Sequence, residues 1–226
     1  MKPDYRWHYL GTTEQVAIAA CQHILDAAIL AIAERGQFKL VLAGGTTPEK
    51  VYRLLAQSQV DWSKWTIYYG DERCLPKDHA DRNSVMAEQA FLGKVTIPKA
   101  QIFTIPAELG PEQGANLYQQ AVKDALPFDL VLLGMGEDGH TASLFPGHQN
   151  DAEELAHAVY DSPKPPSERV SLSANALGTA QQVIFLITGS NKQEAVKQWR
   201  SGQNLPVASI DSDKIDIYID RDAYQG

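Results

Sequence analysis

The residues with the clearest chemical potential lie in the segment Gly134–Thr141, where His140 follows a glycine-rich turn and Asp138 stands two residues before it. An imidazole with an ordinary pKa of about 6.5 can accept a proton from water at neutral pH, and a nearby carboxylate can fix its tautomer. His140 is therefore the strongest candidate for a residue that moves a proton. The remaining histidines have no comparable context: His8, His23, His79, His148 and His157.

A second candidate site is the segment Gly44–Pro48, which joins an expected strand to an expected helix. Backbone N–H groups at a helix N-terminus, together with the hydroxyls of Thr46 and Thr47, are typical of a phosphate cradle. A tight turn in which Thr47 caps a helix that begins at Pro48 is an equally good interpretation of the same residues.

A third cluster, Gly70–Arg73, provides two acids, Asp71 and Glu72, and the guanidinium of Arg73 just beyond another expected strand. Such a cluster can bind hydroxyls, stabilise an oxyanion or form an internal network of ion pairs. A metal site that combines Asp71, Glu72, Asp81 and His140 has no diagnostic ligand spacing, and we predict none.

The spacing Gly134-x-Gly136-x-x-Gly139 also matches the dinucleotide-binding fingerprint, but the chemistry argues against that interpretation. Glu137 and Asp138 would place two negative charges next to a pyrophosphate. No long helix follows, because Pro146 and Gly147 interrupt the segment after His140.

The elements that must position these residues alternate between strand and helix. A helix is expected between Thr12, which fits a capping box with Gln15, and Gly36, which stops it. Strands and helices then alternate, which indicates an α/β fold with a mainly parallel, Rossmann-like sheet and helices on both faces. Strands are expected at 39–43, 65–69, 102–105, 128–133, 169–173, 182–187 and, at one edge, 216–219; further helices are expected at 48–57, 84–92, 111–125 and 192–200.

Four of these strands run directly into polar, glycine-bearing loops that begin at Gly44, Gly70, Gly134 and Gly189. Parallel strands share a direction, so the four loops should meet at the carboxyl edge of the sheet, where open α/β folds bind ligands. The segment 149–167, with three prolines, is expected to be a surface loop with one short helix near 153–158; it could instead close over the cleft. It marks no boundary, so residues 1–226 are expected to form a single domain.

Composition excludes several classes of protein. The chain has 226 residues, with 20 Lys and Arg against 28 Asp and Glu, which gives a formal net charge of −8. That balance disfavours nucleic acid and anionic membranes as partners, since both attract basic surfaces. Cys21 and Cys74 cannot form a disulfide framework. The apolar stretch Val16–Ala33 is interrupted by polar residues and does not read as a membrane span, so a cytoplasmic protein is expected.

Three motifs together carry a resemblance to a known family. They are Gly44–Pro48, Gly70–Arg73 with Pro76 and Asn83, and the long run Gly134–Gly147. The later segments Arg169–Ser173, Gly189 with Lys192, and Leu205–Pro206 occur in the same order. The sequence resembles 6-phosphogluconolactonases over nearly its whole length, and the third motif is the most specific.

The resemblance implies hydrolysis of 6-phospho-D-glucono-1,5-lactone, a step of the oxidative pentose phosphate pathway, on the sugar-phosphate isomerase/deaminase fold without a metal or organic cofactor. It implies that His140 is the general base and that Arg73 stabilises charge at the reacting centre. From their places in the sequence, we expect Asp138 or Asp71 to orient the imidazole or bind sugar hydroxyls. The resemblance assigns substrate or phosphate binding to Gly44, Gly45, Thr46, Thr47, Glu72, Arg169 and Lys192. The expected partner is a small phosphorylated sugar lactone, and the expected state is a monomer or weak dimer.

Two departures from the family pattern concern the binding loops. Ala43 stands where a serine commonly precedes the two glycines, and Arg82 replaces a small residue before Asn83. The main rival is a glucosamine-6-phosphate deaminase or isomerase, which typically has an acidic residue five positions after the histidine. That position is Phe145 here. A sugar-phosphate sensor without turnover is the second rival. An anionic substrate on a chain of net charge −8 predicts a locally positive pocket.

Overall fold

The computed structural model describes residues 5–148 and 153–225, and its centre is a six-stranded sheet in which all neighbouring strands are parallel. Such a sheet is buried on both faces, which explains the continuous apolar runs at its middle strands. In spatial order the strands are β1 (Tyr5–Leu10), β9 (Ile215–Asp220), β8 (Val183–Ile187), β5 (Leu130–Gly134), β2 (Phe38–Leu42) and β3 (Trp65–Tyr69).

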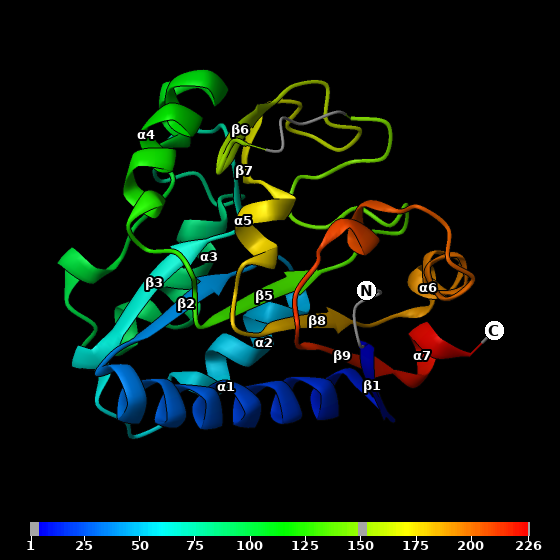
Figure 1. Ribbon diagram of the computed structural model, residues 1–226, viewed down its shortest axis with the longest axis horizontal. Coiled ribbons are helices and arrows are strands. Elements are labelled where there is room, and N and C mark those ends of the chain that lie inside the picture. Colours follow the sequence, from blue (N-terminus) through cyan, green and yellow to red (C-terminus); the bar gives the residue numbers. More distant parts are fainter. Residues whose placement is uncertain (1–4, 149–152, 226) are drawn as a thin grey trace.

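Helices and a second sheet cover the two faces of this sheet. Figure 1 shows α1 and α2 beneath it, and α5 and the smaller sheet above it. The helices of the described chain are α1 (Thr13–Arg35), α2 (Thr46–Leu55), α3 (Asn83–Ala90), α4 (Pro111–Lys123), α5 (Ala174–Gly178), α6 (Gln193–Arg200) and α7 (Arg221–Tyr224). The predicted α/β class, the parallel sheet and the helices on both faces are confirmed.

The strand order contains the reversal that creates a binding crevice. From β2 the chain moves outward to the edge strand β3, then returns past β2 to β5 and continues through β8 to β9. The reversal therefore lies between β2 and β5, and the loops that follow these strands separate there. The predicted meeting of the loops after β2, β3, β5 and β8 at one edge is confirmed by this topology.

The second sheet has three antiparallel strands in the order β4 (Asp71–Arg73), β7 (Arg169–Leu172) and β6 (Ala156–Val159). Gly70 joins it directly to the large sheet. The Gly70 N–H donates to Leu42 O at 2.9 Å in the large sheet, and Gly70 O accepts from the Leu172 N–H at 2.8 Å in the small one. The small sheet consequently stands over the carboxyl edge of β3.

Helix α1 has the predicted ends. Thr12 accepts a hydrogen bond from the Gln15 N–H at 3.2 Å, and Gly36 ends the helix with a left-handed φ of 76°. By length and composition α1 could cross a membrane, but it packs on the sheet through buried residues such as Val16, Ala20 and Ile24. It is a core helix of the α/β layer.

Several predicted elements are wrong. Residues 102–105 form no strand, because only Ile102 bridges to β3, and the helix expected near 153–158 is replaced by strand β6. The strand at 216–219 exists as β9, but β1 lies outside it and forms the edge. Part of the segment 149–167, at 149–152, lies outside the described residues.

Candidate active site

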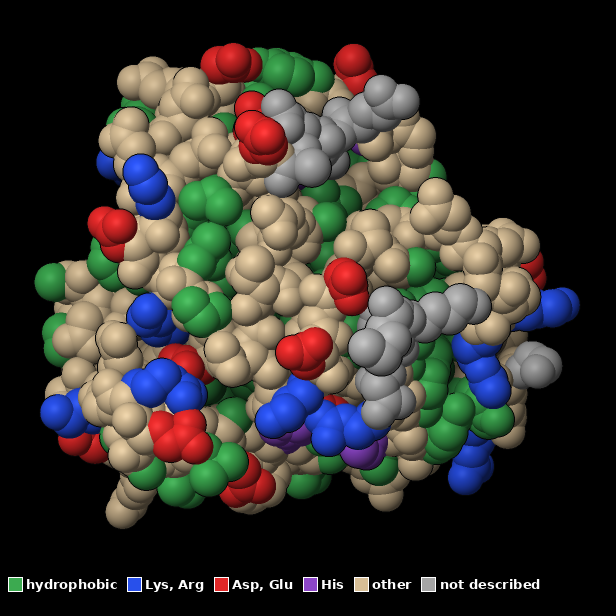
Figure 2. Space-filling view, in the orientation of Figure 1, with side chains coloured by type: hydrophobic (Ala, Val, Ile, Leu, Met, Phe, Trp, Pro, Cys, Tyr) green, Lys and Arg blue, Asp and Glu red, His purple; other side chains and the backbone are tan. Residues whose placement is uncertain are grey.

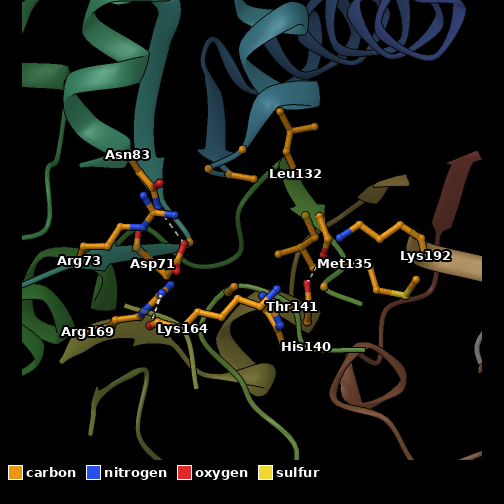
Figure 3. A pocket seen from close by; sticks show the side chains of 18 of the residues that line it. Asp71, Arg73, Asn83, Leu132, Met135, His140, Thr141, Lys164, Arg169 and Lys192 are labelled. Atoms are coloured by element: carbon orange, nitrogen blue, oxygen red, sulfur yellow. Dashed lines mark hydrogen bonds between the residues drawn. The ribbon is translucent and has the colours of Figure 1, made fainter. Parts of the chain in front are cut away.

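A cleft of about 410 Å³ lies at the carboxyl ends of the parallel strands, between the large sheet and the small one. The loop after β2 and the loop after β5 form one wall, and residues of β4, β7 and the segment before β7 form the other (Figure 3). Its described lining includes Gly44, Gly45, Asp71, Arg73, Asn83, Met135, His140, Thr141, Lys164, Arg169 and Lys192.

At the floor of the cleft, His140 forms a hydrogen-bonded pair with Asp138. Asp138 Oδ1 lies 2.5 Å from His140 Nδ1 and 3.2 Å from the His140 backbone nitrogen, which donates to it. Since Nδ1 is engaged by the carboxylate, Nε2 is the ring nitrogen left for chemistry. The structure therefore makes Asp138 the carboxylate that orients the imidazole.

Gly136 makes the room that this pair occupies. A methyl group at Gly136 would lie 2.0 Å from His140 Nδ1 and 2.6 Å from Asp138 Oδ1. The turn is closed by the Gly136 N–H, which donates to His140 O at 2.8 Å. Gly136, the middle glycine of the Gly134-x-Gly136-x-x-Gly139 spacing, is therefore explained by the room that the His140–Asp138 pair needs, without a dinucleotide.

The protonation states of the pair suit proton transfer. Burial lowers the pKa of His140 below its ordinary value, although the Asp138 carboxylate opposes that shift. Burial raises the pKa of Asp138, but the charge and hydrogen bonds of His140 outweigh it and hold that pKa below its usual range. At neutral pH the pair is therefore a neutral imidazole beside an ionised carboxylate.

The two acids of the β4 segment have different places. Asp71 lines the cleft, where its carboxylate accepts hydrogen bonds from Asn83 Nδ2 at 3.0 Å and from the Ser143 hydroxyl at 2.5 Å. Glu72 does not line the cleft: it is 1% exposed and accepts from the backbone N–H groups of Asn83 and Ser84 at 2.8 and 2.9 Å. Glu72 therefore caps the N-terminus of α3, which departs from its predicted role in substrate binding.

Arg73 and Arg169 are register partners on the neighbouring strands β4 and β7 of the small sheet. Arg73 donates to the backbone oxygen of Asp81. Arg169 lies 5.6 Å above the ring of Phe145, and burial lowers its pKa. Phe145 in turn packs 4.7 Å from the His140 ring, so the arginine and the imidazole share one aromatic support.

Lys192 reaches the cleft from the turn after β8, in the 3-10 segment Ser190–Lys192. Burial and the charge of Lys164 lower its pKa. In Figure 3, Lys192 enters beside Met135, on the opposite side from Arg73 and Arg169. The cationic groups are therefore distributed around the cleft instead of forming one patch.

The charge of the cleft is opposite to that of the chain. Among its described lining residues, Arg73, Lys164, Arg169 and Lys192 are basic and Asp71 is the one acid. Figure 2 shows acidic and basic side chains interspersed over the face in view, without a dominant acidic patch. The predicted positive pocket on a protein of net charge −8 is confirmed.

The loop after β2 departs in part from its predicted form. Gly44 and Gly45 line the cleft, but helix α2 begins at Thr46 with Gly45 as its N-cap, and Thr47 instead pairs with the Thr188 hydroxyl at 2.6 Å. Thr46 and Thr47 are not among the described lining residues. The prediction that Thr47 caps a helix beginning at Pro48 is therefore wrong.

The two departures from the family pattern have structural explanations. The backbone of Ala43 is held by the Tyr52 hydroxyl, which accepts from its N–H at 2.8 Å and donates to its oxygen at 2.7 Å. Arg82 is 3% exposed and ties its loop to Glu108 and to the oxygen of Ile105, at 2.9 and 2.8 Å. Ala43 itself lines the cleft, whereas Arg82 shapes a loop behind it.

Comparison with known proteins agrees with this geometry. Residues 11–219 match the family described as glucosamine-6-phosphate isomerases/6-phosphogluconolactonase. The chain belongs to this family. A solved 6-phosphogluconolactonase from Thermotoga maritima has a TM-score of 0.90 at 26% identity and covers 96% of this chain and 100% of its own.

Curated relatives of this family member carry related names. A 6-phosphogluconolactonase from Synechocystis sp. is 40% identical over 175 residues, which are 74% of this chain and 72% of the relative. A probable chloroplastic 6-phosphogluconolactonase 4 from Oryza sativa is 36% identical over 204 residues, or 82% of this chain. The chain spans 63% of that rice relative's length.

Sequence reasoning missed Lys164, a cleft-lining residue of this member of the 6-phosphogluconolactonase family. Its Pro-rich surroundings read as a surface excursion, and its place in the cleft depends on pairing between β6 and β7. Among residues 5–148 and 153–225, no group of three or more His, Cys, Asp or Glu is placed to hold a metal ion.

Proposed function

We propose that this chain hydrolyses 6-phospho-D-glucono-1,5-lactone to 6-phospho-D-gluconate, as in the oxidative pentose phosphate pathway. The observation that carries the proposal is His140, oriented by the Asp138 carboxylate in a cleft lined by four basic side chains. Family membership supports the same chemistry.

In the proposed mechanism, His140 Nε2 accepts a proton from a water molecule as that water attacks the lactone carbonyl carbon. The new C–O bond produces a tetrahedral oxyanion. Collapse of this intermediate breaks the bond between the carbonyl carbon and the ring oxygen, and the imidazolium of His140 returns its proton to the departing ring oxygen. Asp138 holds the imidazole in one tautomer and stabilises its charged form.

Arg73 is the proposed donor to the oxyanion, because a guanidinium held at the cleft stabilises charge that develops there. Asp71 is held by Asn83 and the Ser143 hydroxyl, which fits a residue that binds sugar hydroxyls at a fixed place. Lys192 and the backbone of Gly44 and Gly45 are proposed to receive the phosphate, next to the N-terminus of α2.

The rival deaminase activity has less support. The position that is acidic in that family is Phe145 here, and its ring packs against His140 and Arg169. An apolar ring cannot assist the proton transfers of sugar-ring opening. A solved monomeric glucosamine-6-phosphate deaminase with 22% identity and a TM-score of 0.82 shares the fold alone.

The decisive assay measures lactone hydrolysis above its spontaneous rate, by coupling the product to 6-phosphogluconate dehydrogenase. We expect clear acceleration by the wild-type protein and a large loss of kcat in His140→Asn, with little change in KM. If the protein does not accelerate lactone hydrolysis, the deaminase and sensor hypotheses become the favoured ones. Near-wild-type turnover of His140→Asn would refute the role of the imidazole while leaving the activity itself in place.

We also propose that residues 1–226 act as one 6-phosphogluconolactonase domain, as a monomer or weak dimer in the cytoplasm. His140, Arg73 and Lys192 all line one cleft, which supports a single functional domain. Both cysteines are free thiols, consistent with a reducing compartment. Gel filtration at assay concentration and fractionation of the source cells test these two points.

A further inference from the structure

The segment before β7 is held in place by Arg169. This guanidinium donates to three successive backbone oxygens, at 3.0 Å to Lys164, 3.3 Å to Pro165 and 3.2 Å to Pro166. Ser162 adds a hydrogen bond from its hydroxyl to Lys164 O at 2.9 Å. The position of Lys164 is thus fixed by a buried arginine, which gives Arg169 a positioning role besides the phosphate binding predicted for it.

The side chain of Lys164 extends from beside Arg169 toward His140, across the lower part of the cleft in Figure 3. Its Nζ pairs with the Glu137 carboxylate at 2.9 Å, and the two side chains are 44% and 53% exposed. Since exposed ion pairs of this kind contribute little stability, Lys164 can exchange Glu137 for a better anion at small cost.

Lys164 and Lys192 are two like charges that line the same cleft. Each is within electrostatic range of the other and of Glu137. The hydrogen bond from Lys164, the charge of Lys164, a hydrogen bond from Asn191 and the charge of Lys192 all lower the pKa of Glu137. Glu137 is therefore an acid on which both ammonium groups act, Lys164 through an ion pair at 2.9 Å and Lys192 through its charge.

Resting on the proposed function, we propose that Lys164 is a phosphate-binding, specificity-determining residue and that Glu137 is its substitute partner in the absence of substrate. The phosphate of a sugar phosphate carries a charge of about −1.5 to −2 at neutral pH, against −1 for the carboxylate. Lys164 exchanges its ion pair with Glu137 for one with the phosphate, so the phosphate is held between Lys164 and Lys192.

The test compares Lys164→Met and Glu137→Gln with wild type, using inorganic phosphate as a calorimetric probe and phosphorylated and unphosphorylated gluconolactone as substrates. Lys164→Met is expected to weaken phosphate binding on the order of tenfold. It should also raise KM for the phosphorylated lactone by about tenfold, with KM for the unphosphorylated lactone little changed. Glu137→Gln removes the competing carboxylate and is expected to tighten phosphate binding by roughly twofold to fivefold. The double variant should bind phosphate as weakly as Lys164→Met alone.

Lys123→Met is the matched control, because it removes the same charge from an exposed position in the last turn of α4. Equal effects of Lys164→Met and Lys123→Met on phosphate affinity would overturn the inference, as would weaker phosphate binding in Glu137→Gln. If wild-type protein hydrolyses no lactone but Lys164→Met still loses phosphate affinity, the proposed function fails and the phosphate site stands. If hydrolysis is normal and phosphate affinity is unchanged, the Lys164 inference alone fails.

Discussion

Replacing Gly136 by alanine perturbs the His140–Asp138 pair without changing any ionisable group. The added methyl carbon would lie 2.0 Å from His140 Nδ1, 2.1 Å from Cε1 and 2.6 Å from Asp138 Oδ1. Nonbonded carbon and nitrogen atoms need well over 3 Å, so the imidazole must move by about 1 Å or more. The backbone of Gly136 does not have the positive φ that would itself penalise alanine.

A displacement of about 1 Å at a catalytic group can cost on the order of 100-fold in rate, and we expect that loss in kcat of Gly136→Ala. In wild type the hydrogen bond to Asp138 raises the pKa of His140. The displaced imidazole of Gly136→Ala should lose this hydrogen bond. Removing that contact would therefore lower the pKa of His140 further below its ordinary value. The coupled assay measures the first effect, and a pH titration of the His140 ring by NMR measures the second.

Gly134→Ala is the control for the imidazole, because a methyl group there meets nothing within 4 Å and the position has no positive φ. Its His140 titration should match that of wild type. The reasoning is refuted if Gly136→Ala folds normally, with an unchanged melting temperature, and keeps kcat within about threefold of wild type.

Three further predictions concern single side chains. Asp138→Asn should lower the pKa of His140, move the acidic limb of the kcat/KM profile to lower pH and reduce kcat on the order of tenfold, whereas a profile unchanged from wild type would contradict the pairing. Glu72→Gln should lower the free energy of unfolding by about 2 kcal/mol in urea titrations with KM nearly unchanged; a raised KM at full stability would restore its role in substrate binding. His157 has both ring nitrogens buried without a partner, and burial lowers its pKa to about 4 from 6.5. Between pH 6.5 and 4 the imidazole of His157 binds a proton in the unfolded chain but not in the folded protein. The free energy of unfolding should therefore fall by on the order of 3 kcal/mol as the pH is lowered through this range. The same pH dependence in His157→Leu would show that another group causes it.

The parts of the fold that were predictable are those where local chemistry and tertiary structure agree. Thr12 and Gly36 supply the cap and stop signals of α1, and the apolar runs at β2, β5 and β8 are long enough to be buried on both faces. The motif around His140 was informative for the same reason, since its pair with Asp138 spans two residues and needs no distant partner.

The parts that could not be predicted depend on contacts far apart in the chain. Ala156–Val159 follows two glutamates and a leucine, a composition that favours helix, yet pairing with β7 makes it a strand. Strand β4 is too short and too polar to show an alternating pattern. Lys164 enters the cleft from a loop whose backbone is bound by Arg169, on strand β7. Glu72 caps α3 because the helix begins at Asn83, whose N–H donates to the Glu72 carboxylate, and the sequence does not show this contact.

Gly70 gives the two walls of the cleft a common anchor. Its N–H belongs to the hydrogen bonds of the large sheet, and its oxygen to those of the small sheet, so no linker separates the walls on that side. Displacing Gly70 from either sheet would break a hydrogen bond that anchors it. The gap that receives substrate is therefore preset in width along β3 and β4, and a larger or smaller substrate would have to be accommodated by changes to the segment that carries Lys164. Engineering of substrate size should begin with that segment and leave the strand junction intact.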